Sequence, residues 1–134
     1  MSNFLSEKLN TLNVFKNSKQ TSLANYRPYV ITKNLVFISG QLPIKEKTLL
    51  HTGKVGKNIS IVETKKSLEI ATYNLLWTLS DAIDEYKNVK NTKCINLKGY
   101  LNCINNFDEH SLLFNTASDI IIEILGFENG SHSR

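Results

Sequence analysis

Small and polar residues interrupt an apolar run in the first half of the chain. The run Leu35–Ile38 has the composition of a β-strand, and Ser39, Gly40 and Gln41 follow it directly. A strand that ends in such residues, just before Pro43, delivers polar groups to the rim of a sheet, where ligands often bind. The missing side chain of Gly40 would let the backbone approach a ligand, although a β-bulge would also call for glycine.

The cysteines and histidines do not have the spacing of a metal site or of a known nucleophile motif. Cys94 and Cys103 do not form a C-x-x-C pair, and His51, His110 and His132 are scattered along the chain. The sequence has no nucleophile elbow, no Ser/His/Asp constellation that spacing can reveal and no phosphate-binding loop. We therefore expect reduced structural cysteines, no metal and no cofactor.

The length and composition are those of one ordinary globular domain. The 134 residues are 41% hydrophobic and 21% charged, which is enough apolar material for one core. No signal peptide and no apolar run of about 20 residues is present, so a cytoplasmic location without membrane insertion is expected. The net charge of +4 permits weak attraction to RNA, but the lysines are dispersed, so nucleic acid is not an expected partner.

The first 23 residues predict an N-terminal extension ahead of a main domain that spans residues 24–134. Leu5, Leu9 and Leu12 are spaced as one face of a short helix, which we expect to dock on the body of the protein. The polar stretch that follows, residues 16–22, reads as a linker.

The sequence of the main domain predicts four elements in the order hairpin, helix, strand, helix. Residues 29–39 form the hairpin, with its turn at Lys33 and Asn34, and an irregular connection with hinges at Gly53 and Gly56 follows. Ser60 and Glu63 form a capping box that starts a helix, and residues 95–102 alternate as a strand. Inward positions of the first helix are expected at Leu68, Ala71, Leu75, Leu79, Ile83 and Tyr86, with Trp77 also in the core.

The second helix of the domain begins after Asp108, which we expect to be its N-cap. Its inward residues are expected to be Leu113, Ala117, Ile120, Ile121 and Ile124, and Gly126 should end it. Two helices segregated to one face of a mixed sheet give an α+β fold.

Six short motifs occur in this order along the chain, and together they resemble one family. They are Pro28–Val30, Ser39–Pro43, Gly53–Gly56, Asn74–Leu76, Gly99–Asn102 and Phe114–Asp119. Each motif is weak alone, but their ordered occurrence over residues 24–134 resembles the RidA (YjgF/YabJ-like) family of reactive enamine and imine deaminases, also called the endoribonuclease L-PSP family. The resemblance is greatest to the longer, YabJ-like branch.

The resemblance implies a fold similar to the Bacillus-type chorismate mutase, with a mixed sheet backed by two helices. It also implies a homotrimer in which a ligand cleft lies at each subunit interface. The family continues past its key arginine for about two strands, whereas this sequence stops at Arg134. The sheet is therefore expected to be incomplete.

The resemblance also carries site residues over to this sequence. Arg134 matches the family's carboxylate-binding arginine, and a guanidinium suits that role because its planar donors meet both carboxylate oxygens. Tyr29 matches the cleft tyrosine, Asn115 matches an asparagine near the ligand, and Gly40 lies where the backbone approaches it. Without the resemblance, Arg134 would be interpreted as a solvated terminal charge. Tyr29 would be interpreted as a half-buried strand residue, and Asn115 as a helix residue that faces solvent.

The implied reaction is hydrolysis of a 2-enamine or 2-imine acid, such as 2-aminoacrylate or its imine, to a 2-keto acid and ammonia. Two alternatives remain open. One is a non-catalytic trimer that binds 2-keto acids in the same cleft. The other is RNA cleavage, which the basic charge permits but no basic and aromatic surface motif supports.

Overall fold

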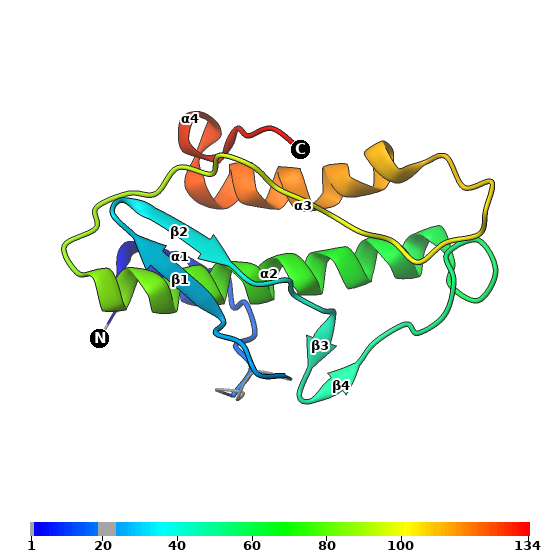
Figure 1. Ribbon diagram of the computed structural model, residues 1–134, viewed down its shortest axis with the longest axis horizontal. Helices are drawn as coiled ribbons and strands as arrows, with labels where there is room; N and C mark the ends of the chain where they lie inside the picture. Colours follow the sequence, from blue (N-terminus) through cyan, green and yellow to red (C-terminus); the bar gives the residue numbers. More distant parts are fainter. Residues whose placement is uncertain (1, 19–23) are drawn as a thin grey trace.

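Two long helices form the centre of the molecule, with strands on one side and a short helix on the other. The computed structural model describes residues 2–18 and 24–134, so the predicted linker at residues 16–22 lies partly outside the described residues. The central helices are α2 (Ile61–Tyr86) and α3 (His110–Leu125). Figure 1 shows the β1–β2 hairpin in front of α2 and the short helix α1 (Phe4–Thr11) behind it.

Helix α2 begins at the predicted capping box. The Glu63 backbone N–H donates to Ser60 Oγ at 3.1 Å, and the Ser60 backbone N–H donates to Glu63 Oε2 at 2.8 Å. These hydrogen bonds stabilise the ionised carboxylate and lower the pKa of Glu63. The predicted start of this helix is confirmed.

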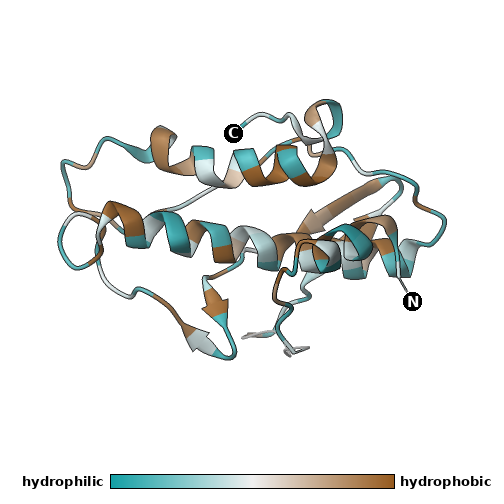
Figure 2. Ribbon diagram, turned by 180° about the vertical axis from the view of Figure 1, so that it is seen from behind, coloured by the Kyte–Doolittle hydropathy of each residue, from teal (hydrophilic) through white to brown (hydrophobic). Residues whose placement is uncertain are grey.

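The buried side of α2 is wider than the sequence pattern indicated. Leu79, Ile83 and Trp77 are buried as predicted, but Leu76 is the most deeply buried apolar residue of this helix, and Tyr86 is exposed. The difference arises because α2 packs against the hairpin, α1 and α3 at once, whereas Tyr86 lies in its last turn. Apolar and polar residues alternate along both long helices (Figure 2).

Helix α3 buries all five residues predicted to face inward: Leu113, Ala117, Ile120, Ile121 and Ile124. It ends at Gly126, whose φ of 87° is a conformation that glycine adopts without strain. The predicted cap at Asp108 is wrong, because the N-cap is Glu109 and no side chain caps the first turn.

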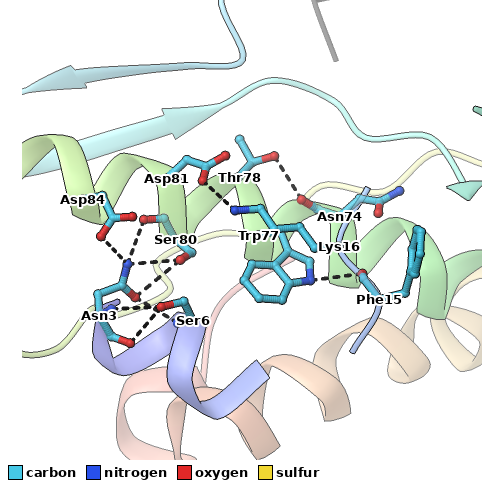
Figure 3. Close-up of polar contacts among 10 residues, drawn as sticks. All are labelled: Asn3, Ser6, Phe15, Lys16, Asn74, Trp77, Thr78, Ser80, Asp81 and Asp84. Carbon is cyan, nitrogen blue, oxygen red and sulfur yellow. Dashed lines mark hydrogen bonds and ion pairs between the residues drawn. The ribbon is translucent and has the colours of Figure 1, made fainter. Parts of the chain in front are cut away.

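The N-terminal helix α1 is part of the main core. Leu5 and Leu9 are 1% and 0% exposed and lie in the same cluster as residues of α2 and α3. Asn3 caps α1 and donates through its amide to Asp84 Oδ1 at 2.8 Å on α2, and Trp77 Nε1 donates to the Phe15 carbonyl at 3.1 Å (Figure 3). The predicted docking of this helix is confirmed.

The strands form two antiparallel hairpins. Strands β1 (Tyr29–Thr32) and β2 (Leu35–Ile38) pair with Val30 opposite Phe37, as predicted, although Lys33 takes the positive φ in the turn. Strands β3 (Ile44–Lys45) and β4 (Thr48–Leu49) form a second, short hairpin inside the stretch that we expected to be irregular.

The segment predicted as a strand at residues 95–102 is extended but pairs only near its ends. Parallel bridges join Asn96 to Ser133 and Cys103 to Val55. Between those bridges, Lys98 to Leu101 have no backbone partner among the described residues, so no regular ladder forms. In Figure 1 this segment runs beside α3, on the same side of the helix pair as the hairpin. The two-helix, one-faced α+β arrangement is thus confirmed.

None of the helices in the described part of the chain has the length and apolar character needed to cross a bilayer.

Candidate functional site

A cavity of about 320 Å³ lies between α3 and the C-terminal segment that folds back over it. Its lining contains mostly polar and charged side chains, several of which can donate or accept hydrogen bonds. The lining residues are Asn115, Ser118, Asp119, Ile122, Ser131, His132 and Arg134. The structure therefore brings two predicted site residues, Asn115 and Arg134, to one place.

The close approach of Gly130 to α3 positions the C-terminal segment. Gly126 reverses the chain, the short helix α4 (Phe127–Gly130) follows, and a Cβ at Gly130 would lie 2.5 Å from Ile122 Cα. Beyond α4, Ser133 bridges to the extended segment, with its N–H donating to the Ile95 carbonyl at 3.1 Å. Ser131 and His132, which line the cavity, are thus held between α4 and the bond from Ser133 to Ile95.

Gly130→Ala is expected to destabilise the fold by about 1–3 kcal/mol, because the new methyl group meets backbone atoms that cannot turn away. Urea denaturation measures the change. Gly40→Ala is the control: a Cβ at Gly40 has no atom within 4 Å, so its effect should stay within about 0.5 kcal/mol. Equal stabilities of the two variants would contradict the packing role of Gly130.

Ser118 and His132 form a hydrogen-bonded pair inside the cavity. His132 Nε2 lies 2.9 Å from Ser118 Oγ, and His132 Nδ1 lies 2.5 Å from the Gly130 carbonyl oxygen. A carbonyl can only accept, so Nδ1 carries the proton in the neutral ring and Nε2 accepts from the Ser118 hydroxyl. The pair fastens the C-terminal segment to α3.

Arg134 points into the same cavity. Its Nη1 donates to Ser118 Oγ at 3.4 Å and its Nη2 donates to the Ser111 carbonyl at 3.3 Å. A guanidinium has five N–H donors, so three remain for a ligand. The exposed Asn115 amide has no hydrogen-bond partner within the described chain and is also available. This arrangement can bind a small carboxylate from two sides.

Tyr29 and Gly40 do not line this cavity in the single chain. The Tyr29 hydroxyl donates to Glu85 Oε2 at 2.5 Å on α2. Partial burial, together with the bond to the Glu85 carboxylate, raises the pKa of Tyr29 to about 12. Gly40 precedes a loop held by Asn74, whose amide donates to the carbonyls of Leu42 and Ile44 at 3.1 and 2.9 Å. Hence one chain presents two separate groups of predicted residues.

Tyr29→Phe is expected to reduce the loss of stability at alkaline pH. The Tyr29 pKa rises from 10.0 to about 12 on folding, so the native chain holds the phenol proton more tightly. This stabilisation is present below about pH 10 and is lost as the pH rises toward 12. Urea denaturation between about pH 9 and pH 12 should show the two proteins converging. Tyr100→Phe, with a side chain that is 87% exposed, is the control and should not converge.

The sequence analysis did not identify Ser118 and His132 as members of the site, nor Asn74 as the residue that holds the loop after Gly40. Ser118 and Asn74 each lie inside a motif that carried the resemblance, and His132 lies two residues before Arg134. The position of Ser118 and Asn74 inside those motifs was the available signal. The pairing of Ser118 with His132 becomes visible only when α4 folds back.

Comparison with known proteins agrees with this fold. The model of the family described as YjgF/chorismate_mutase-like, putative endoribonuclease matches residues 8–134. Protein TCP17 of Trypanosoma cruzi is 28% identical over 110 residues, which cover 82% of this chain and 68% of that protein.

Two solved structures resemble the chain over almost its whole length. The protein Atu1372 of Agrobacterium tumefaciens, of unknown function, has a TM-score of 0.77 and 29% identity, covering 98% of this chain and 79% of that one. A putative endoribonuclease of Shewanella oneidensis MR-1 has a TM-score of 0.78 and 27% identity, covering 98% and 85%. The predicted chorismate-mutase-like fold is confirmed, and the chain belongs to the YjgF/chorismate-mutase-like, putative endoribonuclease family.

Proposed function

We propose that the protein hydrolyses 2-enamine and 2-imine acids to 2-keto acids and ammonia, with the substrate carboxylate bound by Arg134. The observation that carries the proposal is the cavity that brings together Arg134 and the Asn115 amide. Among the described residues, three Arg134 donors and this amide have no hydrogen-bond partner. A planar guanidinium holds a carboxylate in one orientation, which a point charge does not.

The chemistry demands little beyond binding and proton transfer. A protonated imine is already electrophilic, so the site has to hold the carboxylate, admit a water molecule and move protons. No covalent intermediate is needed. The polar lining of a cavity of about 320 Å³ is compatible with a small organic acid and a water molecule.

We further propose a homotrimer with the cleft completed between protomers. The outward face of the hairpin carries Val30 and Phe37, a cross-strand pair that is 50% and 60% exposed, and Leu35 beside them. Ile95 and Tyr100, on the extended segment, are also exposed. In Figure 1 this segment lies on the same side of the helix pair as the hairpin. A strongly apolar outer face favours self-association. In the proposed trimer, Tyr29 and Gly40 of one protomer would lie toward Arg134 of another.

The test is ammonia release from freshly generated 2-aminoacrylate or 2-iminobutanoate. An amino-acid dehydratase supplies the substrate, and the purified protein should accelerate decay above the rate in buffer. No acceleration, combined with saturable binding of 2-oxobutanoate, would favour a non-catalytic binding protein. Mass measurement in solution should give a trimer, and a monomer at assay concentration would contradict the shared cleft.

The description of the family as putative endoribonuclease makes RNA the natural comparison substrate. We expect no specific RNA partner, because the net charge is only +4 and the lysines are dispersed. Single-stranded RNA incubated with the protein should stay intact. Cleavage, or affinity that falls steeply with salt, would favour the RNA function instead.

A further inference from the structure

The Ser118 hydroxyl lies between a base and an anion-binding group. On one side, the unprotonated His132 Nε2 accepts its proton at 2.9 Å, and the Gly130 carbonyl fixes the ring in this tautomer. On the other side, Arg134 Nη1 donates to the same oxygen at 3.4 Å. The hydroxyl oxygen has two lone pairs, and Arg134 occupies one of them. The other can accept a proton while the Ser118 proton passes to His132.

The distance between Arg134 and Ser118 suits a 2-imino acid in particular. In such an acid the C=N carbon is bonded directly to the carboxylate carbon. A carboxylate bound by Arg134 could therefore bring the reacting carbon near Ser118 Oγ, which lies 3.4 Å from Arg134 Nη1.

We propose that Ser118 and His132 form the proton relay for imine hydrolysis, an inference that rests on the proposed function and names its acid–base residues. As water attacks the protonated imine carbon, Ser118 Oγ takes a proton from the water and passes its own to His132 Nε2. A C–O bond forms, and the C=N electron pair moves to nitrogen, giving a neutral carbinolamine.

The relay then runs in reverse. The His132 imidazolium returns its proton through Ser118 to the amine nitrogen, the C–N bond breaks, and ammonia leaves with that bond's electron pair. The carbinolamine oxygen forms C=O, and its proton passes back through the relay to solvent. The balance is imine cation plus water to 2-keto acid, ammonia and a proton, with no oxidant or metal consumed.

The other charged groups that line the cavity are compatible with both states of the relay. They are Asp119, one residue after Ser118, and Arg134, whose positive charge a substrate carboxylate would offset. In the proposed relay Ser118 contacts the reacting water, so it is a catalytic residue, as is Arg134, which binds the substrate carboxylate. His132 acts through Ser118 and is a positioning residue, so its test needs a readout beyond loss of activity.

The experiment compares ammonia release by the wild type, Ser118→Ala and His132→Gln. Both variants should lose about 100-fold or more in kcat with little change in KM, since binding depends on Arg134. Gln keeps a polar contact with Ser118 but cannot take up the proton that the relay passes to the imidazole, so the dependence of kcat on pH should differ between His132→Gln and the wild type. Ser67→Ala removes a hydroxyl that lies 2.7 Å from His51 Nδ1, in a serine–histidine pair that does not line the cavity, and is the control that should keep wild-type kcat.

The outcomes separate the two proposals. If the wild type is active and His132→Gln stays within about threefold of it, the relay is wrong and the proposed function stands. If the wild type does not exceed the rate in buffer, the proposed function fails and takes the catalytic relay with it. Imidazole nitrogen NMR tests the pair independently of activity: the relay requires the Nδ1–H tautomer of neutral His132, and the Nε2–H tautomer would overturn it.

Discussion

Replacing Leu9 by alanine is expected to lower the free energy of unfolding by about 3–5 kcal/mol. Leu9 is 0% exposed and lies in the cluster that joins α1 to α2 and α3. The lost side chain removes apolar contacts and leaves a cavity, because helices held on three sides cannot collapse into the space. Urea denaturation at 25 °C, with a constant m-value, measures the change.

Leu12→Ala is the matched control for this experiment. Leu12 follows the last turn of α1 as its C-cap and is 45% exposed, so the same substitution there should cost well under about 1 kcal/mol. If the two variants were equally stable, α1 would be a loosely attached extension. A large difference would instead place the whole helix inside the cooperative unit, in agreement with a family match that begins at residue 8, within α1.

Helix periodicity was the part of the fold that the sequence predicted best. All five inward residues of α3 and the capping box of α2 were predicted correctly, because both depend on spacings of three and four residues within one helix. The inward face of α2 was predicted less well. A helix that packs on three elements has no single buried stripe, and its own sequence does not reveal which elements pack against it.

The pairing of the strands was the part of the fold that the sequence predicted least well. The β3–β4 turn uses Glu46 and Lys47 at φ values of 50° and 69°, where turn rules favour glycine or asparagine, so the hairpin was missed. Residues 95–102 alternate as a strand should, yet ladder formation depends on a partner backbone that alternation does not reveal. Local pattern predicts which residues are extended, but not what they pair with.

The candidate site divides in the same way. Arg134 and Asn115 were identified through a resemblance that matches residues one by one, and the structure places both at one cavity. Ser118 and His132 are fourteen residues apart, and their contact depends on the reversal at Gly126 and the close packing of Gly130. No spacing rule for a helix or a strand predicts that contact, so it could be found only in three dimensions.

Removing the guanidinium in Arg134→Gln is expected to weaken the binding of 2-oxobutanoate by about 10- to 100-fold. Hydrogen bonds to charged groups contribute about 1.5–3 kcal/mol each, and the variant loses both the charge and the fork of donors. Arg134→Lys should lie between the two proteins, since it keeps the charge but not the planar geometry. Titration calorimetry in low-salt buffer measures all three affinities.

A weaker affinity of Arg134→Gln could also arise from a less stable fold or from the loss of one positive charge anywhere on the surface, so both effects need a control. The two hydrogen bonds of Arg134 within the chain are long, at 3.3 and 3.4 Å, and its side chain is exposed, so its loss should barely change stability. Lys8→Gln removes a surface cation that donates to the Glu123 carbonyl and does not line the cavity, so it should leave the affinity unchanged. If Arg134→Gln bound 2-oxobutanoate as tightly as Lys8→Gln does, the carboxylate would be held by other residues. The cavity between α3 and the C-terminal segment would then not be the ligand site.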